Sequence, residues 1–578
     1  MRVLGVDVGG TFTDAVLVSD AGLRTAKVPT ALRQEESVLA AVREVGATEV
    51  ERFTHGTTVA TNALLERQGA RTAFVATAGF EHLLHLRRQN RAHLYRLCAE
   101  HAEPLVPLER CFGVSERLGP EGVVEPLDLG SLPAVEAEAV AVCLLFSFRD
   151  PSHERAVADE LRRRLPDAHI VASHEVAPEF REYERASTTA ADAYLGPVLA
   201  RYLGSLAARC RDAGLPKPFV MRSSGGVATV EEVAAHASWA LLSGPAGGVV
   251  GAARIASEAG FPDAISFDMG GTSTDVCLIT GGEVERSTER SIAGLPIRLP
   301  SVDVHTVGAG GGSIAWRDEG GALRVGPASS GARPGPACYG FGGTQPTVTD
   351  ANLVLGRLPH RLAGGLELDR EAAERALGDF EPADVVDVVN AEMLRALRLV
   401  SVERGVDPAD LALVAFGGAG PLHACALADE LGARTVLVPE SAGILSAFGL
   451  AVCDERRDHV RSEVRPLAQV EDLPDEGEAD LRYVGQSHEL AVPLGPDLDE
   501  RFHRAHEERY GYADRGRELE LVAVRTAETQ PGPPLRLTSS PPQRAVGPKV
   551  LELDGATCWL PLGWVGVRDG PTWRLTKA

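Results

Sequence analysis

Two short stretches of the chain carry the same residues, and these residue types bind phosphate. Residues 5–14 read GVDVGGTFTD and residues 266–275 read SFDMGGTSTD. The shared residues are Asp7, Gly9, Gly10, Thr11, Thr13 and Asp14 in the first copy and Asp268, Gly270, Gly271, Thr272, Thr274 and Asp275 in the second. Asp7 and Asp268 lie 261 positions apart, too far for a short structural repeat. The repetition predicts one device built twice, once in each of two domains.

Each copy follows an apolar run and precedes another, which predicts a tight turn between two strands. Glycines in such a turn accept positive φ and let backbone N–H groups approach a ligand closely. A threonine hydroxyl adds a donor, and the aspartate at the strand end can hold a hydrated Mg²⁺ ion. Two turns of this kind facing each other would bind a polyphosphate from both sides. A pair of glycine hairpins without a ligand is the alternative, and the repetition argues against it.

The elements around these turns alternate between strands and helices. Residues 35–46 and 151–165 carry apolar residues at helical spacing, and buried strands are predicted on both sides of the second helix. This alternation predicts an α/β protein with largely parallel sheets. The glycine-rich block 308–343 is expected to be an ordered irregular loop. We expect three domains, with residues 1–175 and 176–460 forming the two large ones and residues 461–578 a small α+β domain.

Composition excludes several classes of protein. The formal net charge of −23 over 578 residues argues against a nucleic-acid partner or an anionic membrane surface. No apolar run approaches the roughly 20 residues of a membrane span. The N-terminus lacks the features of a signal peptide, and the nine cysteines are scattered without a C-x-x-C pair. We therefore expect a cytoplasmic protein with reduced thiols.

The two repeated stretches resemble the first and second phosphate motifs of the actin, Hsp70 and sugar-kinase ATPase superfamily. That resemblance implies two RNase H-like domains around a nucleotide cleft. The order of the remaining motifs also fits. Residues 182–197 are similar to the first connecting helix, residues 413–432 to the adenosine motif, and residues 442–452 to the second connecting segment.

Within this superfamily, residues 3–455 resemble the hydantoinase A / 5-oxoprolinase family, which includes the ketone carboxylase β subunits. The resemblance rests on segments such as THGTTVATNALLER, EYERASTT, LLSGPAGGVVGA, GPACYG, PTVTDANLVLGRL and FGGAGPLHA. Asp192 and Ser224 depart from the family pattern, since asparagine is usual at both places. The C-terminal part is also shorter than is typical, which puts subunit contacts made by that part in doubt.

The resemblance implies ATP and Mg²⁺ as cofactors. Asp7 and Asp268 are expected to position Mg²⁺ and the γ-phosphate, with Thr11 and Thr272 as donors to phosphate. Asp14 and Asp275 are expected to cap the turns or orient the threonines rather than to bind metal. The other predicted nucleotide contacts are Gly9, Gly10, Thr13, Gly270, Gly271, Thr274, Gly417, Gly418 and Gly420.

Further candidates for catalysis each have a structural alternative. His55 and His305 are candidates for polarising the substrate, His305 together with Asp303; either histidine could instead be a buried structural residue. Glu184 and Asp192 are candidates for orienting the attacking group, against a solvated helix face. Cys338 lacks triad partners for a nucleophile. His82 and His85 lack the further ligands that a metal site needs.

The resemblance implies ATP-dependent ring opening of a cyclic amide such as a hydantoin or 5-oxoproline. A phosphorylated amide oxygen would make the carbon a better electrophile for water. The hydrolytic half belongs, by resemblance, to a separate hydantoinase B-type subunit, so a hetero-oligomer is expected. Two alternatives remain. One is a ketone carboxylase β-type subunit acting on a ketone, and the other is a non-catalytic ATP-gated binding protein.

Overall fold

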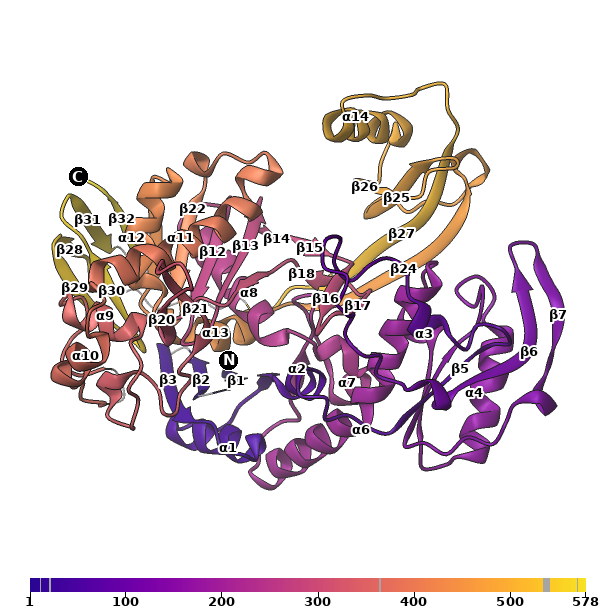
Figure 1. Ribbon diagram of the computed structural model, residues 1–578, viewed down its shortest axis with the longest axis horizontal. Coiled ribbons are helices and arrows are strands. Elements are labelled where there is room, and N and C mark those ends of the chain that lie inside the picture. Colours follow the sequence, from indigo (N-terminus) through magenta and orange to yellow (C-terminus); the bar gives the residue numbers. More distant parts are fainter. Residues whose placement is uncertain (11, 20–21, 363–364, 534–540, 569) are drawn as a thin grey trace.

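The computed structural model describes residues 1–578 apart from positions 11, 20–21, 363–364, 534–540 and 569. Two large mixed sheets form the body of the protein, and a third sheet and a long arm extend from it (Figure 1). No helix in the described ranges combines the length and the apolar character that crossing a membrane requires.

The first large sheet begins with the strand order β3-β2-β1-β4-β10. Strand β1 is antiparallel to β2 and parallel to β4, which is itself parallel to β10. Most of β1 is buried, as the apolar run in its sequence predicts for a central strand. The bounds are β1 (Val3–Val8), β2 (Phe12–Ser19), β3 (Gly22–Pro29), β4 (Arg52–Gly56) and β10 (Phe219–Met221), with helix α1 (Gln34–Glu44) between β3 and β4.

The second large sheet repeats this order as β14-β13-β12-β22-β23. Strand β12 is antiparallel to β13 and parallel to β22, which is parallel to β23. Two sheets with the same order and directions confirm the predicted pair of RNase H-like domains. The bounds are β12 (Ala264–Met269), β13 (Thr274–Thr280), β14 (Glu283–Val284), β22 (Ala412–Phe416) and β23 (Thr435–Pro439).

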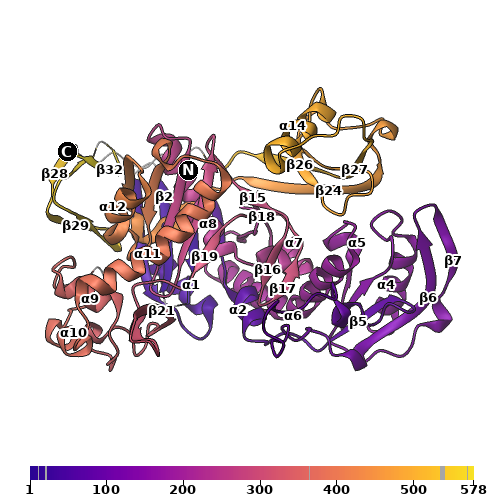
Figure 2. The same cartoon turned by 45° about the horizontal axis from the view of Figure 1, so that its top comes forward.

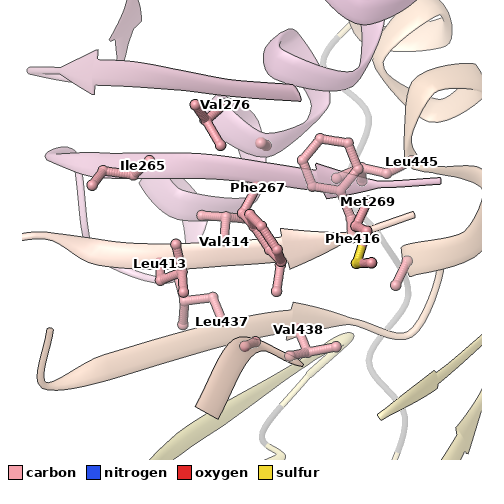
Figure 3. Packing of buried hydrophobic residues seen from close by; sticks show 14 of the residues in the cluster. Ile265, Phe267, Met269, Val276, Leu413, Val414, Phe416, Leu437, Val438 and Leu445 are labelled. Carbon is pink, nitrogen blue, oxygen red and sulfur yellow. The ribbon is translucent and has the colours of Figure 1, made fainter. Parts of the chain in front are cut away.

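Large apolar side chains from neighbouring strands fill the core of the second sheet (Figure 3). Phe267 of β12 is fully buried and packs in one cluster with Val414 of β22 and Leu437 of β23. Two helices of this domain are α11 (Pro382–Val400) and α12 (Gly420–Leu431), and both contribute to the same cluster. This packing fixes the carboxyl ends of β12 and β22, where the second phosphate turn and the adenosine segment begin.

A five-stranded sheet in the order β7-β6-β5-β8-β9 is inserted between β4 and β10. It lies at the end of the molecule opposite the second large sheet (Figures 1 and 2). Helix α4 joins β8 to β9, as the sequence predicts. The bounds are β5 (Thr72–Thr77), β6 (Cys111–Gly119), β7 (Gly122–Asp128), β8 (Ala139–Cys143), α4 (Ser152–Arg164) and β9 (His169–Ala172), followed by α6 (Glu182–Asp212).

The C-terminal residues are shared between both large sheets. Strands β24 (Glu455–Pro466) and β27 (Leu519–Gln530) extend the first sheet beyond β11 (Val227–Thr229) and carry β25 (Glu478–Tyr483), β26 (Leu490–Pro493) and α14 (Leu498–Tyr510) as an arm. Strand β32 (Thr572–Lys577) then pairs with β23 of the second sheet. Residues 461–578 therefore join two sheets, and the division into three domains stays a prediction. The glycine-rich block 308–343 also contains a hairpin, β20 (Ser313–Arg317) with β21 (Leu323–Ser329), which the sequence reading missed.

The predicted first connecting helix is wrong. Residues 182–197 lie in α6, the last helix of the chain segment between β4 and β10 of the first sheet. The helix that leads from the first sheet to the second is α8 (Ser243–Glu258), and α13 (Leu445–Val452) leads back to β24. The two helices pack closely because glycines face each other: a Cβ on Gly449 would lie 1.9 Å from the carbonyl oxygen of Gly247. The α8–α13 pair therefore forms the crossing between the domains.

Candidate nucleotide site between the two sheets

The two repeated stretches form the same turn. Strands β1 and β2 place Asp7 opposite Asp14, and β12 and β13 place Asp268 opposite Asp275. The amide of Gly9 donates to the carbonyl of Phe12 at 3.0 Å, and the amide of Gly270 donates to the carbonyl of Ser273 at 3.0 Å. Thr11, a predicted phosphate donor, lies outside the described residues.

One face of each turn is open. Gly10 and Gly271 are exposed, and a Cβ built on either would meet no atom within 4 Å. Gly418, in the predicted adenosine segment, is exposed and open in the same way. Thr272 is also exposed beside Gly271. These positions fit the expected contacts, because a ligand can approach their exposed backbone without meeting a side chain.

Two of the predicted contacts point inward instead. Thr13 is fully buried, and its hydroxyl lies 3.1 Å from the Thr30 hydroxyl, which donates to the carbonyl of Gly9 at 2.9 Å. Thr274 is also fully buried and donates to the carbonyl of Ala309 at 2.5 Å. Both threonines therefore support the shape of the turns, and their hydroxyls are used within the protein.

A glycine-rich loop supports the second turn from behind. The amides of Gly311 and Gly312 donate to the carbonyls of Gly270 and Gly271 at 3.0 and 2.7 Å. A Cβ on Gly310 would lie 2.6 Å from the amide nitrogen of Thr272, so only glycine allows this approach. The motif GAGGGS at residues 308–313 therefore supports the second phosphate turn.

The aspartates at the two strand ends interact electrostatically. Burial, together with the charge of Asp14, raises the pKa of Asp7 to about 7. Burial raises the pKa of Asp268 to about 8, with further contributions from the charges of Asp275 and Asp7. The two turns therefore lie close enough for the acids of different domains to repel each other. Asp7 Oδ1 is also buried without a hydrogen-bond partner.

These two acids fit a hydrated Mg²⁺ ion. Mg²⁺ is held through one or two carboxylates and keeps several waters, so a pair of aspartates suffices. Among the described residues no group of three or more histidine, cysteine, aspartate or glutamate side chains could hold a metal. A cation between Asp7 and Asp268 would stabilise the ionised form of both buried carboxylates, which burial disfavours.

The adenosine segment adjoins the second turn. Register pairs Asp268 with Phe416, the last residue of β22, and the chain then turns through Gly417 at φ +79° into α12. A Cβ on Gly417 would lie 2.2 Å from Asp268 Oδ1, so this position requires glycine. The amide of Ala419 donates to the carbonyl of Met269 at 2.9 Å, and Gly420 packs against β12. The segment thus brings the first turn of α12 to the edge that carries Asp268.

Lys27 is a site residue that the sequence reading missed. Its Nζ donates to Asp14 at 2.7 Å and to the carbonyl of Gly443 at 3.1 Å, so it links the first sheet to the segment before α13. Its positive charge partly offsets the burial that raises the pKa values of Asp7 and Asp268. Lysine is rare in this chain, with only four copies, and one of them stands beside the phosphate turns. Asp275 has a different partner, the hydroxyl of Thr306 at 2.5 Å.

His55 does not face the site. Its ring is fully buried in β4, with Nδ1 3.2 Å from the carbonyl of Val6 and Nε2 2.8 Å from the hydroxyl of Tyr202. Burial lowers its pKa to about 4. Because a carbonyl only accepts, Nδ1 carries the proton and Nε2 accepts from Tyr202. This arrangement favours the structural alternative for His55.

The remaining candidates are placed apart from one another. Glu184 is buried and binds Arg88 through two hydrogen bonds of 2.8 and 2.6 Å. Asp192 is fully buried and accepts from the amide of Ser238 at 3.0 Å. Both acids are therefore buried on α6 and bound to partners within the protein, and neither lies on the solvated helix face that was their alternative. Burial raises the pKa of Cys338, which opposes a nucleophilic role.

His305 is the histidine candidate that stays near the second turn. It is partly buried in β19 (His305–Val307), where it pairs with Val276 of β13. Asp303 is engaged in ion pairs with Arg404 at 2.6 Å and Arg290 at 3.9 Å, so it does not form a unit with His305. A role for His305 toward substrate stays a prediction.

Two family models cover most of the chain. The hydantoinase/oxoprolinase N-terminal region matches residues 3–165, and hydantoinase/oxoprolinase matches residues 185–459. The chain belongs to the hydantoinase/oxoprolinase family. This confirms the resemblance inferred from the motifs. The two matched regions contain both phosphate turns, the adenosine segment and the α8–α13 crossing.

The chain is similar to subunits of a caprolactamase and of a carboxylase. The chain is 35% identical to caprolactamase subunit alpha of Pseudomonas jessenii, over 90% of this chain and 85% of that one. It is 35% identical to the acetophenone carboxylase gamma subunit of Aromatoleum aromaticum, over 78% of this chain and 68% of that one. The crystal structure of ATP-dependent caprolactamase from Pseudomonas jessenii superposes with a TM-score of 0.87 at 32% identity, over the full length of both chains.

Proposed function

We propose that this chain uses ATP to activate a cyclic amide for ring opening, as one subunit of a larger enzyme. The observation that carries the proposal is the pair of open glycine turns from two sheets, whose aspartates lie within electrostatic reach of each other. The caprolactamase relative, named as an ATP-dependent enzyme, supports the cyclic amide as substrate class. A hydantoin, 5-oxoproline or a related lactam would serve.

The residues present would divide the work between them. Asp7 and Asp268 would hold Mg²⁺, and the exposed backbone at Gly10, Gly271 and Gly418 would bind the nucleotide. Bound Mg²⁺ supplies charge neutralisation for phosphoryl transfer. Such transfer depends mainly on positioning and electrostatic stabilisation, which preformed turns provide without reorganisation. Attachment of a phosphoryl group to the amide oxygen removes the resonance that protects the carbonyl carbon from water.

The Asp268→Ala variant tests the assignment of the site. It should bind Mg·ATP more weakly and lose about 10²–10³-fold or more of the ATP turnover, because a carboxylate positioned for the reacting groups is lost. The fold should survive, since the raised pKa shows that this buried carboxylate is unfavourable where it stands. Asp263→Ala is the matched control. Asp263 directly precedes the first residue of β12, at the opposite end of the strand from Asp268, and accepts a hydrogen bond from the amide of Gly281. Wild-type turnover in Asp268→Ala would refute the site.

The second part of the proposal concerns the partner. The caprolactamase and acetophenone carboxylase relatives are both named as subunits. We expect this chain to assemble with a hydantoinase B-type subunit that completes hydrolysis. Native mass measurement of the complex from its own host tests this. Full substrate hydrolysis by the pure single chain would contradict it.

The acetophenone carboxylase relative supports a second candidate, activation of a ketone for carboxylation. The same turns would then direct phosphoryl transfer to an enolate oxygen and to bicarbonate. Labelled bicarbonate separates the candidates, because only the carboxylase incorporates the label into its product. ATP turnover should be compared across lactams, hydantoins and ketones, with and without the co-purifying partner.

A further inference from the structure

A cavity of about 220 Å³ opens where the first sheet, the arm and the segment from β15 (Arg286–Ser287) to β18 (Ser301–Val302) meet. Its walls come from the chain before α6, from the turn after β10, from residues 298–300 and from β24. Trp239, Leu299 and Val460 provide apolar surface on these walls. A cavity of this size and character suits a compact, partly apolar molecule.

The cavity lies at the edge of the sheet that carries the first phosphate turn. Strands β1, β4 and β10 are parallel, and their register puts Val6, His55 and Val220 in line. Arg222, two residues after Val220, is therefore level with Val8, which directly precedes the first phosphate turn. The two positions are two strands apart, which corresponds to about 10 Å. In open α/β sheets ligands bind at the carboxyl ends of the parallel strands. The position is thus suited to a molecule that reacts with the terminal phosphate.

Three buried polar atoms of the residues lining this cavity have no hydrogen-bond partner. They are Arg222 Nε, Ser224 Oγ and Asp458 Oδ2. Arg222 is 7% exposed, and its guanidinium lies 4.0 Å above the ring of Trp239. Its Nη1 donates to the carbonyl of Arg456 at 3.0 Å, while Asp458 Oδ1 accepts from Arg456 Nε at 2.8 Å. Unpaired buried polar groups are costly, so such a cluster points to a ligand that pairs with them.

The types of these atoms select among small molecules. Arg222 Nε can only donate, and a carbonyl oxygen can only accept. Asp458 Oδ2 can only accept while ionised, so its partner must bring a donor. A cyclic amide carries one carbonyl acceptor and, beside it, one N–H donor. A ketone carries the acceptor alone and would leave Asp458 unpaired.

We propose that this cavity binds the cyclic amide, with Arg222 donating to its carbonyl and Asp458 accepting its N–H. Ser224 completes the polar wall, and Leu299 and Val460 contribute apolar surface beside the lactam ring. This inference rests on the proposed function and deepens it, because Asp458 becomes the residue that distinguishes lactams from ketones. Sites built to bind a substrate N–H reject analogues that lack it far more strongly than apolar pockets reject a change in size.

Direct binding to the whole protein, purified with any partner that accompanies it and without ATP, tests the inference. The probes are caprolactam, N-methylcaprolactam and cycloheptanone, which share a ring size and a carbonyl. Titration calorimetry or ligand-observed NMR gives the affinities. The wild type should prefer caprolactam by about 10–100-fold, the effect of one hydrogen bond to a charged group.

The variants separate the two polar contacts. Asp458→Ala should weaken the binding of caprolactam by about 10–100-fold and leave the affinities for the other two probes unchanged, because only caprolactam has the N–H group. Arg222→Met should weaken the binding of all three probes, because all three have the carbonyl group. Asp212→Ala, at the exposed end of α6, is the control and should change nothing. The wild-type preference among probes needs no variant, so it remains decisive if a substitution prevents folding.

The outcomes distinguish this inference from the proposed function. Equal wild-type affinity for caprolactam and its N-methyl derivative would overturn the role of Asp458. An equal loss of affinity for all three probes in Asp458→Ala would also overturn the role of Asp458. If lactam-stimulated ATP turnover persists in both Asp458→Ala and Arg222→Met, the proposal that this cavity binds the lactam is wrong. The proposed function would be unaffected by that result. Absence of any lactam-stimulated turnover in the wild-type complex would refute the proposed function itself.

Discussion

Replacing His55 by asparagine should reduce the loss of stability that the protein suffers on acidification. The His55 ring is fully buried between Val6 and Tyr202, and its pKa is lowered to about 4 by that burial. In the unfolded chain the same group has a pKa near 6.5. Between these values the unfolded state binds a proton and the folded state does not. Acid therefore favours unfolding through this residue.

The two pKa values set the size of the effect. Linkage gives a loss of about 1.2 kcal/mol of stability from this residue between pH 7.0 and pH 5.5, with the remainder lost as the pH falls toward 4. Asparagine does not titrate in this range, so the variant should lack this contribution. The wild type should lose about 1.2 kcal/mol more than the variant over the same interval, whatever other groups titrate in both proteins.

Urea unfolding of both proteins at the two pH values, followed by circular dichroism, measures this double difference. Nucleotide affinity by calorimetry and substrate-stimulated phosphate release complete the comparison. Both should stay near the wild-type values if His55 is structural. An equal loss of stability in the two proteins, with stimulated release abolished in the variant, would refute the structural reading and place His55 at the substrate.

Two glycines make further tests. Gly417→Ala should destabilise the protein by about 1–3 kcal/mol, because Gly417 has a positive φ and the new Cβ would collide with Asp268. The thermal midpoint of unfolding measures this loss. Gly418→Ala is the control and should leave the thermal midpoint unchanged, because a Cβ on Gly418 meets open space. Gly449→Leu should destabilise by about 3 kcal/mol or more because it separates α13 from α8, whereas Gly204→Leu on the open face of α6 should not; equal midpoints for the two leucine variants would contradict the close crossing.

The phosphate turns were the part of the site that the sequence predicted best. Six residues recur at one spacing, and each type has a task that a turn beside a phosphate imposes. The direction of Thr13 and Thr274 was missed because both were counted as turn residues. Both threonines lie in strands, where Thr13 pairs with Val8 and Thr274 pairs with Met269, each next to an aspartate pair. Side chains alternate between the two faces of a strand, and this alternation buries Thr13 and Thr274.

The assignment of the first connecting helix failed for a reason of topology. Strand β10 has only three residues, so the sequence pattern gave no sign that α6 returns to the first sheet. The long helix after the inserted sheet was therefore taken as the link between domains. The partners of Glu184 and the cavity around Arg222 were also hidden, because they depend on contacts between segments far apart in the chain, such as β10 and β24.

The α8–α13 crossing adjoins both the candidate nucleotide site and the strand that lines the cavity. A Cβ on Gly244, in the first turn of α8, would lie 3.8 Å from Asp7 Oδ1, so α8 begins beside the first phosphate turn. Helix α13 leads into β24, which carries Asp458. A rotation of the second sheet about this crossing would change the separation of Asp7 and Asp268 and, through the 286–302 segment, the wall of the cavity. Closure of that kind excludes water and aligns the reacting groups, so nucleotide and lactam should each favour the closed arrangement that the other binds.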